Sequence, residues 1–203
     1  RDSKYSPDEI HKFTKEAVGG IYFSPINKEA KTLADIGFTI YRGKNTEIKQ
    51  HLKKTYDIVH KIAEQAKVGV RFSTLCTYAS KLFSDNNLKP SKRIILNSDQ
   101  KQNLNLGHSI PGIALNDQIS GNSFEEIKEH IRTKRINVVD TEDFEIPSTY
   151  AFTIESRLED LTNPQMPSAS WHFMVCFNEG EKIILDDFKE IFKVAGMDYM
   201  NIK

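Results

Sequence analysis

The stretch SASWHFMVCFNEGEKIILDDF, residues 168–188, predicts two β-strands joined by a tight turn at residues 179–180. The first strand opens at His172, and the second closes on Asp186 and Asp187. Because a hairpin brings its far ends together, we expect this imidazole to lie beside one of the two acids. A two-residue turn places His172 opposite Asp187, which we favour, whereas a three-residue loop selects Asp186.

A candidate nucleophile lies earlier in the chain, in STLCTYASKLF. Cys76 follows Ser73 or Thr74, either of which can cap a helix there. The unpaired N–H groups and the dipole of a helix start stabilise a thiolate, which is the reactive form of cysteine. Packing in the core is the alternative role for this thiol. A nucleophile, a histidine and an acid in this order predict a Cys76–His172–Asp187 catalytic triad, with Asp186 as the alternative acid.

The segments CTYASKLF, NLKPSKRIIL and HFMVCFNEGEKIILDD resemble the transglutaminase-like, papain-related cysteine enzymes, and the last is most similar to bacterial effector glutamine deamidases. The resemblance covers about twenty residues at each end of the expected core. It implies Cys76 as nucleophile, His172 as base and Asp187 as orienting acid. It also implies an α+β, papain-like fold.

By this resemblance, the expected activity is acyl transfer on a protein substrate through a thioester, as in a glutamine deamidase or transglutaminase. A papain-like protease or deubiquitinase is the alternative, and an inactive binding module on the same fold is a further one. The expected partner is a host protein, met in the cytoplasm or after secretion by a bacterium into a host cytosol.

Composition narrows the class of protein. The 203 residues carry 28 basic and 28 acidic side chains, so no net charge favours nucleic acid as a partner. No apolar run approaches the roughly 20 residues that cross a bilayer. Two cysteines favour free thiols over a disulfide framework, although a Cys76–Cys176 bridge stays open. We expect a single catalytic domain over 1–203, with a helical part at 1–67, a core at 68–203 and an insertion at about 97–149.

Periodicity assigns the elements. Helices are expected before Gly19, at 27–36, at 46–67, from residue 73, at 123–134 and near the C-terminus; strands are expected at 93–96, 150–155, 171–177 and 182–186; residues 97–122 are expected to form a loop. Helices first and an antiparallel sheet later favour α+β.

Other candidate sites are weaker. Cys176 in mid-strand lacks the activation of a helix start, so core packing is the simpler role. His108, within GHSIPG at 107–112, marks a turn or contributes to a substrate loop. No paired Cys or His spacing indicates a metal site, and no phosphate-binding glycine loop is present, so no metal and no cofactor is expected.

Overall fold

The computed structural model describes residues 14–27, 29, 32–91, 104–112 and 123–200. Its centre is an antiparallel sheet in the order β1 (Val18–Phe23), β4 (Ile36–Tyr41), β9 (Ala169–Asn178), β8 (Tyr150–Asp160) and β5 (Leu88–Pro90), and β10 (Glu181–Leu185) also pairs with β9. Two small ladders join β2 (Ile26–Asn27) to β3 (Thr32–Leu33) and β6 (Asn105–His108) to β7 (Asn137–Val139).

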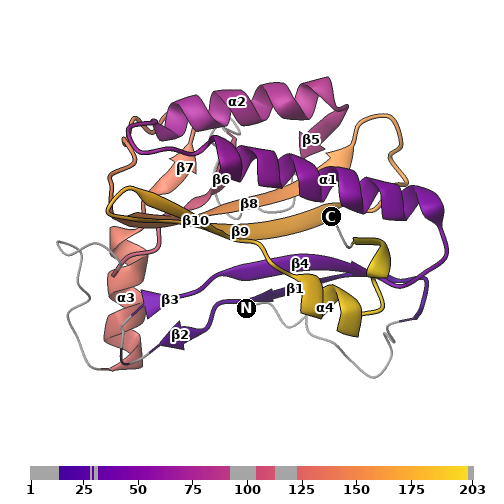
Figure 1. Cartoon of the computed structure of the whole chain (residues 1–203), viewed down its shortest axis with the longest axis horizontal. Helices are drawn as coiled ribbons and strands as arrows, with labels where there is room; N and C mark the ends of the chain where they lie inside the picture. The colour runs from indigo at the N-terminus through magenta and orange to yellow at the C-terminus, as the bar shows by residue number, and fades with distance from the viewer. Residues whose placement is uncertain (1–13, 28, 30–31, 92–103, 113–122, 201–203) are drawn as a thin grey trace.

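Two long helices, α1 (Thr46–Gln65) and α2 (Phe72–Asp85), lie side by side over one face of this sheet (Figure 1). The shorter α3 (Phe124–Lys134) lies near the left end of the molecule in Figure 1, whereas α4 (Lys189–Val194) lies right of the centre, below β4. A 3₁₀ turn at Asp198–Met200 follows α4. The core fills the layer between helices and sheet, where Tyr56 of α1 makes edge-to-face contacts with Trp171 and Phe173 of β9 at 5.3 and 5.1 Å between ring centroids.

Helix α1 forms where its apolar period predicts it. Asn45 caps the helix, since its side-chain oxygen accepts hydrogen bonds from the backbone of Glu47 and Ile48. One stripe is buried against the sheet: His51, Leu52, Thr55, Tyr56, Ile58, Val59, Ile62 and Ala63. The helices predicted from residue 73 and at 123–134 are confirmed as α2 and α3, and α3 begins at the predicted capping box of Ser123 and Glu126. The predicted cap of α2 at Ser73 or Thr74 is wrong, since Arg71 occupies the N-cap position and makes no side-chain capping hydrogen bond.

The N-terminal part differs from the expectation of helices. Residues 18–23 and 36–41 are strands that pair with each other, and β4 also pairs with β9. Strand β4 is positioned by its pairing with β9, which lies more than 130 positions downstream, and Thr39 reinforces the junction by accepting a hydrogen bond from the Ser170 N–H at 2.7 Å. Most of the helix predicted before Gly19, and the strand predicted at 93–96, lie outside the described residues, and β6 occupies part of the expected loop.

The opening hairpin is confirmed. Strand β10 pairs with β9 in the register Glu181↔Asn178 to Leu185↔Met174, and both turn residues, Glu179 and Gly180, have positive φ. This is the register that the two-residue turn predicts. The pairing of β10 with β9 ends at Leu185, however, and β4 rather than β10 pairs with β9 at His172 and Trp171.

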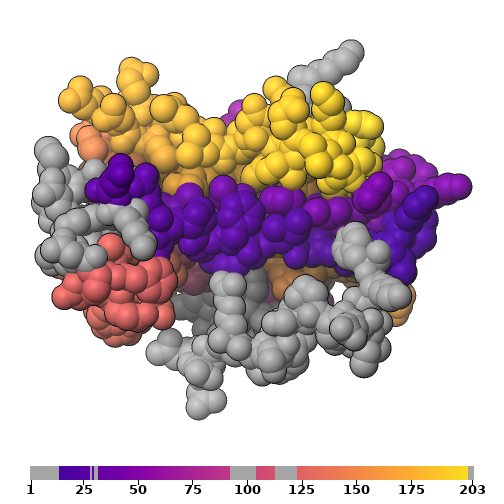
Figure 2. Space-filling model, turned by 90° about the horizontal axis from the view of Figure 1, so that it is seen from below, coloured from indigo at the N-terminus to yellow at the C-terminus, as the bar shows by residue number. Residues whose placement is uncertain are grey.

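Figure 2 views the molecule from below and shows the N-terminal strands running across this face between α3 and the C-terminal segment. Three consecutive residues of β1, Ile21, Tyr22 and Phe23, are more than two-fifths exposed. Among the described helices, none combines the length and apolar character needed to cross a bilayer.

Candidate metal centre

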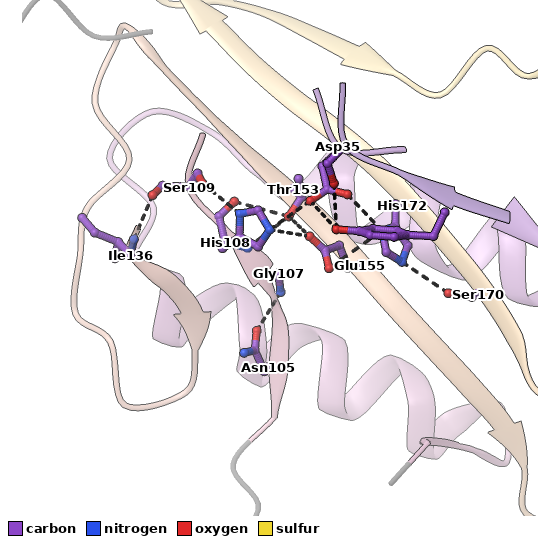
Figure 3. Close-up of polar contacts among 12 residues, drawn as sticks. Asp35, Asn105, Gly107, His108, Ser109, Ile136, Thr153, Glu155, Ser170 and His172 are labelled. Atoms are coloured by element: carbon purple, nitrogen blue, oxygen red, sulfur yellow. Dashed lines mark hydrogen bonds and ion pairs between the residues drawn. The ribbon is translucent and has the colours of Figure 1, made fainter. Parts of the chain in front are cut away.

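Four ionisable side chains from four separate parts of the chain meet on the sheet (Figure 3). Asp35 immediately precedes β4, His108 ends β6, Glu155 lies in β8 and His172 lies in β9. The sheet register explains the meeting, because His172 pairs with Glu155 on one side and with Gly37, two residues after Asp35, on the other. Cross-strand neighbours have Cβ atoms about 5 Å apart on the same face.

His108 joins the two carboxylates. Its Nε2 lies 3.2 Å from Asp35 Oδ2 and 2.9 Å from Glu155 Oε1. The other ring nitrogen, Nδ1, donates to the Ser109 carbonyl at 2.9 Å. With the Nδ1 proton used in this way, Nε2 of a neutral ring would point a lone pair at two carboxylate oxygens. A positive species, either a second proton or a metal ion, is therefore required at Nε2.

His172 approaches the same carboxylates from the other side, so that Asp35 and Glu155 lie between the two imidazoles in Figure 3. Its Nδ1 is 3.7 Å from Asp35 Oδ1 and 3.8 Å from Glu155 Oε2. Both Nδ1 and Asp35 Oδ1 are buried and have no hydrogen-bond partner. Buried polar atoms without partners are uncommon and costly, so this gap demands an explanation.

These contacts determine the pKa values in the cluster formed by Asp35, His108, Glu155 and His172. Burial alone would raise the pKa of Asp35, but the hydrogen bond from His108 and the charges of His108 and His172 outweigh burial and hold this pKa well below its usual value. The same balance lowers the pKa of Glu155, chiefly through His108. For His108, burial would lower the pKa, but the two carboxylates raise it to about 9.

Neighbouring residues hold the cluster in place. The Thr153 hydroxyl lies 2.6 Å from Glu155 Oε1 and also accepts a hydrogen bond from the His108 N–H at 3.0 Å. Tyr22 donates its hydroxyl proton to Asp35 Oδ2 at 3.1 Å, and its ring packs edge-on against His172 at 5.2 Å between centroids. Gly37 leaves room for His172, since a Cβ at this position would come within 2.8 Å of the imidazole.

Asp35, His108 and Glu155 offer ligand atoms that lie within 4.8 Å of one another. One imidazole nitrogen and two carboxylates suit divalent metal ions, and ligand histidines commonly donate their second N–H to a backbone carbonyl, as His108 does to Ser109. The partnerless Asp35 Oδ1 is a further donor with no other use in the structure. The residues present therefore fit a metal ion.

Cys76, the predicted nucleophile, does not belong to this cluster. It is fully buried within α2, and its thiol contacts the Val138 carbonyl at 3.4 Å. The helix begins at Phe72, and the Leu75 N–H already donates to the Arg71 carbonyl, so Cys76 lies beyond the unpaired N–H groups that would stabilise a thiolate. Burial, and then the charge of Asp140, raise the pKa of this thiol to about 12.

The two acids of the hairpin have other partners. The Asp187 carboxylate accepts a hydrogen bond from the Lys189 N–H at 3.2 Å, near the start of α4. Asp186 pairs with His60 of α1 at 2.8 Å. Of the residues predicted as a triad, His172 alone enters the cluster, where it contacts Asp35 and Glu155. Both cysteines are free thiols, as expected.

Comparison with solved structures identifies the class of fold, the pita-bread fold of creatinases, prolidases and methionine aminopeptidases. The dipeptidase PepE from Mycobacterium ulcerans matches with a TM-score of 0.60 at 12% identity, over 87% of this chain and 39% of that one. The X-Pro aminopeptidase from Thermotoga maritima matches with a TM-score of 0.52 at 18% identity, over 83% of this chain and 39% of that one.

The methionine aminopeptidase from Rickettsia prowazekii matches with a TM-score of 0.56 at 11% identity, over 85% of this chain and 65% of that chain. This chain thus spans about two-fifths of the first two matched proteins and about two-thirds of the third. No family model matches the sequence, and no curated protein matches it.

These findings overturn the cysteine-enzyme interpretation. The fold is not papain-like or transglutaminase-like, and the assignment as a Cys-His-Asp acyl-transfer enzyme is wrong. The effector interpretation depended on the same resemblance and is unsupported. Physically, the sequence pattern around Cys76 is that of a core helix, and the hairpin pattern is that of a central sheet.

Sequence reasoning missed Asp35 and Glu155, and it read His108 as a turn or loop residue. A usable signal was present in TLADIGF and AFTIESR, where one acid interrupts an otherwise apolar, strand-like run. Acidic residues are rarely buried without a partner, so acids in such positions mark candidate sites.

Proposed function

We propose that this chain is a metal-dependent peptidase whose cation is held by Asp35, His108 and Glu155. The observation that carries the proposal is their convergence, within 4.8 Å, on the sheet of a pita-bread fold. The matched structures of this fold are named as peptidases, which supports peptide cleavage as the chemistry of this chain. Asp35 is fully buried, which is costly for a carboxylate unless positive charge compensates it.

A divalent ion at this position supplies Lewis-acid chemistry, polarising a carbonyl and lowering the pKa of water. The residues of the chain hold the donors in place around it. Ser109 fixes the tautomer of His108 through its carbonyl, and Thr153 orients Glu155 through its hydroxyl. Tyr22 is half-exposed on the edge strand β1 and bonds Asp35, so its phenol lies where the cluster approaches solvent.

The proposed substrates are short peptides with a free N-terminus. The matched proteins include an X-Pro aminopeptidase, a prolidase and a methionine aminopeptidase. Peptides with proline in the second position and peptides that begin with methionine are therefore the two panels to test.

The test is a metal-reconstitution assay. The chain is stripped with a chelator, reloaded with Zn²⁺, Co²⁺ or Mn²⁺, and incubated with both panels, and the products are identified by mass. We expect cleavage only after reloading. Glu155→Gln should lose at least about 100-fold in rate, since it removes a ligand charge. Glu181→Gln, on the exposed end of β10, is the matched control and should retain full activity.

Two results would contradict the proposal. The first is the absence of metal binding by the intact chain at micromolar ion concentrations. The second is peptide binding without cleavage in any metal form, which would favour a binding module. In that module a protonated His108 would bridge Asp35 and Glu155 directly, at the distances of 3.2 and 2.9 Å.

A further inference from the structure

Strand β1 lies at one edge of the central sheet and lacks the features that usually protect such an edge. Within the described residues, β1 pairs with β4 on one side only (Figure 1). Its sequence, VGGIYF, includes no charged residue and no proline, which natural edge strands commonly use to prevent association. Ile21, Tyr22 and Phe23 are each more than two-fifths exposed. An edge of this kind favours pairing with a further strand.

The side chains of β1 alternate between the two faces of the sheet. Tyr22 faces the carboxylate cluster, where its hydroxyl donates to Asp35 at 3.1 Å. Ile21 faces the opposite side, toward α4, and the period of two places Phe23 on that side as well. Both faces of this edge strand therefore present apolar or aromatic side chains.

An apolar groove lies beside this edge, between the sheet and α4. Ile21, Phe38 and Ile40 line the groove from the strands, and its volume is about 450 Å³. Val194 of α4 also lines the groove and is 86% exposed. Contiguous exposed apolar surface commonly marks a contact with another protein.

The sequence of β1 is complementary to itself when two copies run antiparallel about Ile21. In that register the two Ile21 residues lie opposite each other. Gly20 then lies opposite Tyr22 of the second copy. Gly19, in the same way, lies opposite Phe23. Each aromatic residue thus meets a glycine on the same face of the sheet, and an aromatic ring packed over a cross-strand glycine compensates for the missing side chain.

The structure leaves room for these rings. No described atom lies within 4 Å of the position that a Cβ of Gly20 would occupy. Gly19 pairs with Ile40 of β4, which lines the groove, so a Phe23 ring of the second copy that covers Gly19 would reach the groove. The 28 basic and 28 acidic side chains give a formal net charge of zero, so no net charge repels a second copy.

We propose that this chain binds a second copy of itself through β1, antiparallel and about a two-fold axis at Ile21, so that the two sheets continue into one another. Each copy contributes the same strand and the same groove, as a two-fold interface requires. Phe23 of one copy covers Gly19 of the other, and Tyr22 covers Gly20. The interface does not require a bound metal ion, so this inference is independent of the proposed peptidase function.

The first test is sedimentation equilibrium of the intact chain over a range of micromolar concentrations, which measures the dissociation constant of the dimer. We expect the mass to rise with concentration from that of one chain to that of two. The mass of a single chain at every concentration would overturn the proposal.

Substitutions in β1 test the surface. Ile21→Lys should weaken association at least about 100-fold, because it removes an apolar side chain from each copy and places two like charges opposite each other. Gly20→Val should also weaken association, since the open space at Gly20 admits the new side chain in a single copy but Tyr22 of the second copy then has no room.

The matched control is Ile183→Lys on β10, because Ile183 is 55% exposed and lies outside the proposed interface. Its dissociation constant should equal that of the intact chain. Circular dichroism verifies that each variant is folded. An unchanged dissociation constant in folded Ile21→Lys or folded Gly20→Val would overturn the proposal.

A mixture of Ile21→Lys and Ile21→Glu tests the register. The new side chains meet only if residue 21 lies opposite itself across the two-fold axis. The mixture should therefore associate about 10-fold more tightly than either variant alone, since an opposite-charge pair replaces a like-charge pair. A mixture that associates no better than the separate variants would overturn the proposed pairing.

Discussion

The cluster makes the stability of the metal-free protein depend on pH, and His108→Gln is the variant that isolates this dependence. The carboxylates of Asp35 and Glu155 raise the pKa of His108 to about 9, from 6.5 in an unfolded chain. A group whose pKa is raised by folding stabilises the folded state most fully below its unfolded pKa. That contribution is lost as pH rises through the folded pKa. The relevant window is therefore pH 6.5 to about 9.

A shift of about 2.5 units at about 1.36 kcal/mol per unit corresponds to about 3 kcal/mol for this buried histidine. The assay is urea unfolding in the presence of a chelator at pH 6 and pH 9.5, for the intact chain and for His108→Gln. The stability difference between the two proteins should shrink by about 3 kcal/mol at the higher pH. A difference that stays constant between these pH values would refute the assignment of His108 as the cation that joins the two carboxylates.

Three further outcomes are expected. Iodoacetamide at neutral pH should leave Cys76 unmodified in the folded chain and alkylate it only after denaturation, because burial raises the pKa of this thiol to about 12. Peptide mass mapping measures the labelling, and rapid labelling of Cys76 in the native chain would contradict this expectation. Gly107→Ala should destabilise the chain by more than about 1–3 kcal/mol in urea unfolding, since the residue has φ +147° and a Cβ would meet the Thr153 carbonyl. Near-native stability of this variant would contradict that expectation and show that β6 can shift. Trp171→Phe should cost about 1–3 kcal/mol by thermal or urea unfolding, because it removes the buried indole hydrogen bond to Thr55 at 3.0 Å, and an unchanged midpoint would contradict that role.

Local signals predict the parts of the fold that depend on local interactions. The hairpin register follows from the turn at residues 179–180, which requires two residues with positive φ. The capping box at Ser123 and the apolar stripe of α1 are likewise confirmed, since both arise within a few turns of one helix. These elements form for reasons contained in their own residues.

The N-terminal strands could not be predicted in the same way. Residues 18–23 include two glycines and occupy the edge of the sheet, and β4 is defined by its pairing with β9 from the other end of the chain. A hydrophobic period measured within one short window cannot detect a partner that distant. The predicted helix at 27–36 was wrong because β2, β3 and the start of β4 occupy it.

The site was missed for a related reason. His172 contacts Asp35 and Glu155, whereas the hairpin pattern predicts its acidic partner at the end of β10. The ladder passes from β10 to β4 along β9, so His172 faces Gly37 and Glu155. Asp35, His108 and Glu155 are separated by 73 and 47 positions, and neither spacing corresponds to a local metal-binding motif.

The pairing of β4 with β9 has a consequence for how the molecule assembles. Because this pairing helps to bring Asp35, just before β4, to Glu155 in β8, an ion bound by both would tie together the ends of a loop of more than one hundred residues, much as a covalent cross-link does. During refolding, this loop would then close when the ion binds. Two complementary fragments, cut anywhere between α1 and α3, would each lack donors and would have to reassociate before either could retain the ion.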